Sequence, residues 1–131
     1  FGEATYLGVS GQLEGEVLAL GLGSIYTFGP TFRSENSNTS RHLSEFWMIE
    51  PEVAFAELDD VAKLAAEFIQ YLIKDVLSKH GAEIDFFGQH YKEGLRATLE
   101  SVANSTFKRI TYTEAVEILK NATKKFDFPV S

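Results

Sequence analysis

The hydrophobic positions in the first half of the chain predict one helix and three strands. Thr5–Val9 (TYLGV) is short, apolar and partly β-branched, which is typical of a strand. Residues 11–23 (GQLEGEVLALGLG) place apolar side chains at roughly helical spacing and close on two glycines, which predicts a helix. Ser24–Arg33 and Ser44–Phe55 are strand-like and flank a polar loop, so they predict an antiparallel hairpin.

The second half of the chain has the pattern of helices. Apolar residues recur at positions i, i+3, i+4 and i+7 over residues 58–77, where Asp59 or Asp60 can cap the start of a long helix. A second, less amphipathic helix is expected at Gln89–Ala103.

The last predicted elements are a short strand at Phe107–Tyr112 (FKRITY) and a helix at Thr113–Asn121. Thr111 and Glu114 have the spacing of a capping box, which marks the start of this helix.

Composition and charge narrow the classes of function. The 131 residues contain no cysteine, which excludes disulfides and thiolate catalysis and fits a reducing cytoplasm. The chain contains no apolar run long enough to span a membrane. The net charge of −7 argues against sequence-independent nucleic-acid binding, so a polyanion would have to meet a local cluster such as Arg33, Arg41 and His42.

The residues from Ser34 to Arg41 form a polar loop between two aromatic segments. Arg33 and Glu35 lie two positions apart at a strand end and share a face, so they form either an anion clamp or an ordinary surface ion pair. His42 has no partner pattern that would indicate a catalytic triad, and the three histidines lack the spacing of metal ligands.

Two further pairs leave alternatives open. Phe46 and Trp47 point to opposite faces of a strand, so one ring belongs to the core and the other either packs as well or offers a face for a base. Glu50 and Glu52 share a face, which suits acid–base work or a magnesium site and equally suits exposed edge charges.

The phrase GPTFRSENSNTSRHLSEFWMIEPE, with SGQL before it and RITYTEAVEIL after it, resembles a known family. It is similar to the motif 2 region of class II aminoacyl-tRNA synthetases of the aspartyl, asparaginyl and lysyl group, and the flanking text resembles the asparaginyl branch. The resemblance implies an α+β fold, part of a class II catalytic domain with an antiparallel sheet and a helical insertion. Residues 1–58 would be the motif 2 part of the catalytic core, 59–105 the insertion, and 106–131 a return to the core.

The resemblance also implies an ATP site, with Mg²⁺ accompanying the nucleotide. Arg33 would be the catalytic residue that grips the α-phosphate, where charge develops during attack by the amino-acid carboxylate. Glu35 would meet the adenine amino group, Phe46 would stack on adenine and His42 would approach the γ-phosphate.

The amino-acid and tRNA sites follow from the same resemblance. Ser10 and Gln12 would hold the α-amino group of L-asparagine, and Glu50 would balance its charge. Aspartyl enzymes carry a lysine near Gly15 or Glu16, whereas Glu16 here can accept from an amide, which favours asparagine over aspartate. The acceptor end of tRNA(Asn) would meet the polar loop, at Asn38, Ser40 and Arg41.

The chain begins and ends abruptly, and neither motif 1 nor motif 3 of the class can be recognised in it. We therefore expect a fragment of a cytoplasmic, homodimeric asparagine–tRNA ligase, inactive by itself. The alternatives are an aspartyl-type synthetase, an amino-acid-activating paralogue and a non-catalytic interaction fragment.

Overall fold

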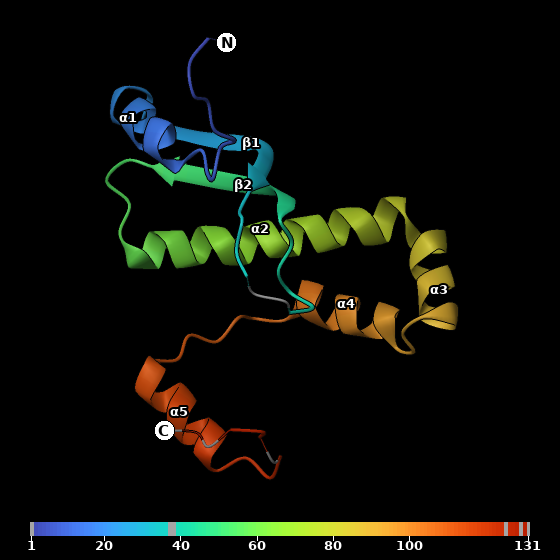
Figure 1. The fold of residues 1–131 in the computed structure, drawn as a ribbon. Helices are drawn as coiled ribbons and strands as arrows, with labels where there is room; N and C mark the ends of the chain where they lie inside the picture. Colours follow the sequence, from blue (N-terminus) through green and yellow to red (C-terminus); the bar gives the residue numbers. More distant parts are fainter. Residues whose placement is uncertain (1, 37–38, 125, 129, 131) are drawn as a thin grey trace. The chain divides into compact units, whose positions relative to one another are not determined.

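The computed structural model describes residues 2–36, 39–124, 126–128 and 130. The chain divides into two compact units, Phe1–Val61 and Ala62–Ser131. The first unit holds a helix and a two-stranded sheet, and the second unit holds the remaining helices (Figure 1). Helices and strands are both present, as expected for an α+β fold.

The first unit is built on the predicted hairpin. Strands β1 (Ser24–Phe32) and β2 (Glu45–Val53) pair antiparallel in one uninterrupted register. The expected strand at Thr5–Val9 is wrong, because this segment is not a strand. Gly8 accepts a backbone hydrogen bond from Phe32 at 3.0 Å, and this contact at the end of β1 does not extend into a ladder.

Helix α1 (Gln12–Leu22) lies close against the hairpin because two glycines face it. A Cβ atom on Gly15 would lie 3.2 Å from the Glu52 Cγ atom, and one on Gly11 would lie 2.5 Å from the Thr27 Oγ1 atom. The helix ends at Gly23, whose φ of 87° favours glycine. The predicted helix and its glycine end are therefore confirmed.

The two faces of the hairpin differ in burial. Thr31 is buried and Phe46 is half-buried on the face that α1 covers in part. Phe28 and Trp47 lie on the other face, where both are exposed and their ring centroids are 5.1 Å apart. Phe46 and Trp47 thus point to opposite faces, as their alternation in the sequence predicts.

The helices of the second half begin with α2 (Leu58–Lys79), and Asp60, one of the two predicted capping residues, lies within its first turn. Its Oδ2 atom accepts from the backbone N–H of Glu57 at 3.0 Å. The expected single helix at Gln89–Ala103 is wrong. Two helices, α3 (Gly81–His90) and α4 (Leu95–Asn104), replace it, because Gly94 between them has a φ of 73° that ends helical geometry.

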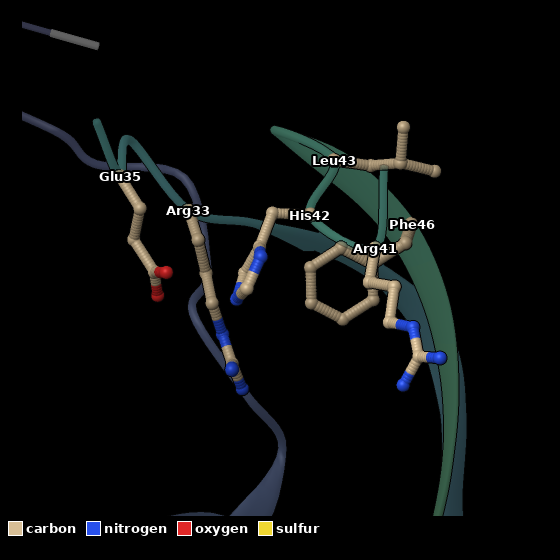
Figure 2. Close-up of a pocket in the computed structure, with 6 residues that line it drawn as sticks. All are labelled: Arg33, Glu35, Arg41, His42, Leu43 and Phe46. Atoms are coloured by element: carbon tan, nitrogen blue, oxygen red, sulfur yellow. The ribbon is translucent and has the colours of Figure 1, made fainter. Parts of the chain in front are cut away.

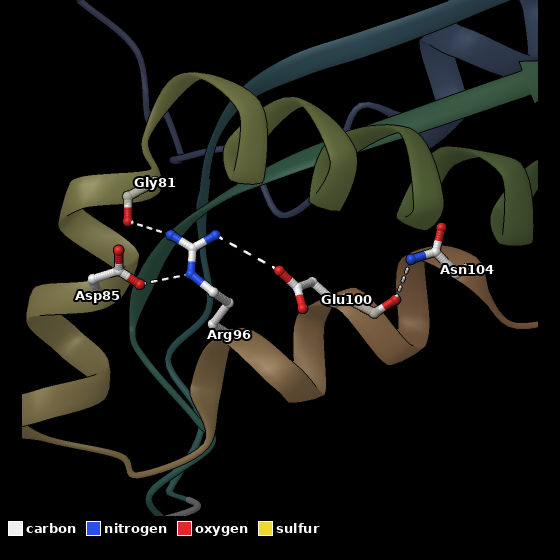
Figure 3. Close-up of polar contacts among 5 residues, drawn as sticks. All are labelled: Gly81, Asp85, Arg96, Glu100 and Asn104. Carbon is white, nitrogen blue, oxygen red and sulfur yellow. Dashed lines mark hydrogen bonds and ion pairs between the residues drawn. The ribbon is translucent and has the colours of Figure 1, made fainter.

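Arg96 joins α3 to α4 (Figure 3). Its Nε atom donates to Asp85 Oδ1 at 2.6 Å, its Nη2 atom donates to the Gly81 carbonyl at 2.8 Å, and Glu100 lies 3.7 Å from Nη1. The hydrogen bond from Arg96 lowers the pKa of the Asp85 carboxyl. This guanidinium therefore holds the helix pair through groups from both helices.

The end of the second unit differs from the sequence prediction in one element. Phe107–Tyr112 is not a strand, because no described segment pairs with it. Helix α5 (Tyr112–Lys120) follows it and confirms the predicted capping box. The Thr111 hydroxyl accepts from the Glu114 N–H at 3.2 Å, and the Glu114 carboxylate accepts from the Thr111 N–H at 2.7 Å.

Few side chains are buried in either unit. Among the described residues, the buried side chains other than glycine are Ala19, Thr31 and Ala103. Apolar burial supplies most of the stability of a domain of this length, so the contacts within each unit contribute little stability from apolar burial.

None of the helices in the described part of the chain has the length and apolar character needed to cross a membrane.

Candidate active site

The mouth of the hairpin forms a pocket of about 420 Å³. Figure 2 shows its side chains, with the charged end of Glu35, the guanidinium of Arg33 and the ring of His42 extending in the same direction from the chain. The pocket brings together all four residues that the resemblance assigned to ATP. Its six lining residues are Arg33, Glu35, Arg41, His42, Leu43 and Phe46.

The hairpin holds the backbone of Arg33, and the guanidinium of this residue can still donate hydrogen bonds. Its backbone N–H donates to the Ser44 carbonyl at 2.9 Å, which continues the β1–β2 pairing past Phe32. Its guanidinium carbon lies 5.3 Å from the Phe46 ring centroid. Its Nη2 atom makes a weak 3.8 Å contact with Met48 Sδ.

The Nε atom of Arg33 is buried and has no hydrogen-bond partner among the described residues. Buried donors in proteins are nearly always satisfied, so this atom is suited to an anion bound in the pocket.

A turn that begins at Thr39 positions His42 at the same pocket. The Thr39 carbonyl accepts from the His42 N–H at 3.3 Å, and the Thr39 hydroxyl oxygen accepts from the Arg41 N–H at 3.3 Å. The same hydroxyl is hydrogen-bonded to His42 Nδ1. With Arg33 and Arg41 in the lining, the pocket is locally basic although the chain carries a net charge of −7.

A second, smaller pocket of about 180 Å³ lies where α1 begins beside the hairpin, and Ser10, Thr27, Thr31 and Glu50 contribute to its lining. The Glu50 Oε2 atom accepts from the Gly11 N–H at 3.0 Å and from the Thr27 hydroxyl at 3.1 Å. Glu50 therefore ties the turn before α1 to both strands.

The residues at the start of α1 form a short chain of hydrogen bonds. The Ser10 hydroxyl accepts from the Gln12 N–H at 3.0 Å, as expected for a residue at the start of a helix. The Gln12 side-chain amide donates to Glu16 Oε1 at 2.8 Å. Ser10, Gln12 and Glu16 are thus linked in one run along the first turn of α1.

The two pockets adjoin. Thr31 lines the smaller pocket and Phe46 lines the larger one, and these residues are direct partners in the strand register. A flat ring with an arginine beside it therefore lies next to a small polar pocket. This arrangement can hold a nucleotide next to a small polar molecule.

Comparison with known proteins identifies the family of the chain. A family model described as "tRNA synthetases class II (D, K and N)" matches residues 2–129.

The chain belongs to the class II tRNA synthetases.

Within this class, asparagine–tRNA ligases are close relatives of the chain. The ligase of Pseudoalteromonas atlantica is 55% identical over 131 residues, which are 100% of this chain and 28% of that protein. The ligase of Myxococcus xanthus is 56% identical over 128 residues, which are 98% of this chain and 28% of that protein. The chain thus spans a little over a quarter of the length of these relatives.

Solved class II synthetases share the fold. The asparaginyl-tRNA synthetase of Pyrococcus horikoshii, complexed with asparaginyl-adenylate, has a TM-score of 0.77 at 34% identity and is matched over 96% of this chain and 28% of that one. The aspartyl-tRNA synthetase of Entamoeba histolytica has a TM-score of 0.74 at 25% identity over 95% of this chain and 26% of that one. The implied fold, part of a class II catalytic domain, is confirmed.

The structure places the remaining predicted residues as follows. Ser40 is exposed next to the Thr39 turn, whereas Asn38 lies outside the described residues. The sequence reasoning missed Thr27 and Thr39, which hold Glu50 and His42. If the pairing register had been known, it would have placed Thr27 opposite Glu50. The one local signal for Thr39 is that it is a polar residue three positions before His42.

Glu50 and Glu52 share a face of β2, and a metal site was one of the alternatives for this pair. The described residues contain no group of three histidine, cysteine, aspartate or glutamate side chains placed to hold a metal ion. Glu50 instead uses one carboxylate oxygen for the Gly11 and Thr27 hydrogen bonds. Neither the magnesium alternative nor acid–base chemistry gains support from this geometry.

Proposed function

We propose that this chain is the motif 2 part of an ATP-dependent asparagine–tRNA ligase, which forms asparaginyl-adenylate and transfers asparagine to the 3′ end of tRNA(Asn). The observation that carries the proposal is the hairpin-mouth pocket. There the buried Nε donor of Arg33 lies beside the Phe46 ring, with Glu35 and His42 in the same lining.

ATP would occupy this pocket in a bent form. The bent form is what the resemblance to class II synthetases implies. The Arg33 guanidinium carbon lies 5.3 Å from the Phe46 ring centroid, so one nucleotide can reach both groups. Arg33 would stabilise the charge that develops at the α-phosphate, and Phe46 would stack on adenine. Glu35 would accept from the adenine amino group, and His42 would donate to the γ-phosphate.

Asparagine would occupy the smaller pocket. Ser10, Gln12 and Glu50 would meet its α-amino group, and Glu16 would accept from its side-chain amide. Glu16 already accepts from the amide of Gln12 at 2.8 Å, which is the same type of hydrogen bond. The first 32 residues contain no lysine or arginine, so none of them could pair with the carboxylate of aspartate.

The other partners are proposed on weaker grounds. Arg41 at the pocket rim, with Ser40 and Asn38, would meet the acceptor end of tRNA(Asn). Mg²⁺ would arrive with the ATP phosphates, and we assign it no residue of this chain. The whole protein would be a cytoplasmic homodimer, and this chain by itself would form no adenylate.

The test is ATP–pyrophosphate exchange by the full-length protein with asparagine and, separately, with aspartate. Exchange with asparagine and little exchange with aspartate is the expected result. Exchange with aspartate alone would replace the proposal by an aspartyl-type synthetase or paralogue. Exchange with neither amino acid would favour the non-catalytic interpretation.

A further inference from the structure

One residue outside the pocket lining, Thr39, makes three contacts with the loop that carries His42. Its carbonyl accepts from the His42 N–H, its hydroxyl oxygen accepts from the Arg41 N–H, and its hydroxyl is hydrogen-bonded to His42 Nδ1. The first two contacts fix the backbone turn. The third reaches the imidazole ring itself, which lines the larger pocket.

We propose that Thr39 is a positioning residue that orients the imidazole of His42 for nucleotide binding, with Nε2 carrying a proton directed at the phosphate tail. This proposal rests on the proposed function, since it takes ATP as the occupant of the pocket.

The Thr39 hydroxyl and His42 Nδ1 can each act as donor or acceptor, and in the arrangement we propose the hydroxyl donates. The Thr39 oxygen already accepts from the Arg41 N–H, and its own hydrogen is available to donate to Nδ1. A neutral imidazole that accepts at Nδ1 must carry its proton on Nε2. When the imidazole is protonated both nitrogens are donors, so Nε2–H remains a donor to an anion in either charge state.

The surroundings of His42 make this orientation matter. Arg33 and Arg41 line the same pocket and would draw the phosphates toward the ring, while Glu35 is the acidic group in the lining. An imidazole with an unprotonated Nε2 would turn a lone pair toward the anion. A Thr39 hydroxyl that donates to Nδ1 excludes this arrangement.

The experiment is a double-mutant cycle on the full-length protein, measured as the affinity for ATP by isothermal titration calorimetry. Thr39→Val keeps the branched shape and removes the hydroxyl, Thr39→Ser keeps the hydroxyl, and His42→Ala removes the ring. Ser34→Ala is the matched control, because it removes an exposed hydroxyl at the same hairpin mouth. The double variant Thr39→Val/His42→Ala completes the cycle.

Thr39→Val removes the hydrogen bonds of the hydroxyl to His42 Nδ1 and to the Arg41 N–H, and we expect it to weaken ATP binding about three- to tenfold. Thr39→Ser and Ser34→Ala should stay within about twofold of wild type. In the His42→Ala background, Thr39→Val should have a much smaller effect, that of the lost Arg41 contact alone. An equal loss in both backgrounds, a loss with Thr39→Ser as large as with Thr39→Val, or no loss at all would overturn the proposal.

Failure of the proposed function can be distinguished from failure of the role of Thr39. The binding cycle needs no adenylate formation, so an intact cycle without asparagine-dependent exchange would reject the ligase assignment and keep the role of Thr39. An additive cycle with normal exchange would do the reverse. If the wild-type protein does not bind ATP, both proposals are wrong.

Discussion

The two units of the chain are held by different kinds of polar contact. In the first unit several contacts join residues far apart in sequence, since Glu50 binds Gly11 and Thr27, and the Arg33 guanidinium meets Phe46. In the second unit many contacts are local, such as the Lys63–Glu67 and Lys79–Asp75 pairs along α2. The residues proposed to bind ATP and asparagine lie in the first unit, whose geometry depends on strand register. Substitutions in this unit should therefore affect activity more than substitutions in the second unit.

The largest effect should come from the arginine of the hairpin mouth. Arg33→Lys keeps the charge and loses the planar fork that contacts phosphate in two places, so exchange with asparagine should fall about 100-fold or more in the full-length protein. Circular dichroism should show an unchanged fold. The matched control is Arg96→Lys in the second unit, which should leave exchange near wild type, and equal losses in the two variants would break the comparison.

A smaller effect should come from the close approach of α1. A Cβ atom on Gly11 would lie 2.5 Å from the Thr27 Oγ1 atom, so Gly11→Ala must displace the turn that Glu50 holds. We expect a loss of about 1–3 kcal/mol in the free energy of unfolding, measured by urea denaturation, together with weaker asparagine binding.

The control for this change is Gly21→Ala in the same helix. A Cβ atom on Gly21 has no contact within 4 Å, so this variant should be neutral or stabilising by up to about 1 kcal/mol. If Gly11→Ala behaves like Gly21→Ala, α1 does not need to lie this close to the hairpin.

In the second unit, Arg96→Met should lower the melting temperature without changing the affinity for ATP. The variant removes the hydrogen bonds to Asp85 and Gly81 that join α3 to α4. Lys63→Met is the control, since it breaks an exposed pair within α2 and should have no measurable effect. A changed ATP affinity in Arg96→Met would show that the helix pair supports the site.

The smallest effect concerns the start of α5 and depends on pH. Hydrogen bonds from Thr111 lower the pKa of the Glu114 carboxyl below its ordinary value of 4.5. The capping contribution is therefore complete above the unfolded pKa and is lost as the pH falls through the lower, folded value. Glu114→Gln should reduce the dependence of stability on pH below about 4.5, as measured by denaturation. An unchanged pH profile would contradict this role of the capping box.

Local sequence signals were sufficient for the elements they encode. Glycines at the end of α1, the apolar period of α2 and the Thr111–Glu114 spacing each act within one or two helical turns, and all are present in the structure. The two wrong strands, Thr5–Val9 and Phe107–Tyr112, show the converse. A strand needs a partner, and no described segment forms a ladder with either of them.

Part of the candidate site was predicted, because some of its residues carry local sequence signals whereas others depend on the strand register or on turn geometry. The FRSE and RHLSEF text marks Arg33, Glu35, His42 and Phe46, and the hairpin brings these residues to one pocket. Thr27 has no such mark. Its contact with Glu50 depends on a pairing register in which residues 23 positions apart face each other. Thr39 lies in a polar run of similar residues, and its contact with the His42 ring depends on the turn geometry.

The most direct test of the nucleotide site is a crystal structure of the full-length protein with ATP and asparagine. The account predicts that adenine stacks on the Phe46 ring, that Arg33 contacts the α-phosphate and that the asparagine amide lies at Glu16. A nucleotide bound elsewhere, with the hairpin-mouth pocket unchanged, would contradict the account.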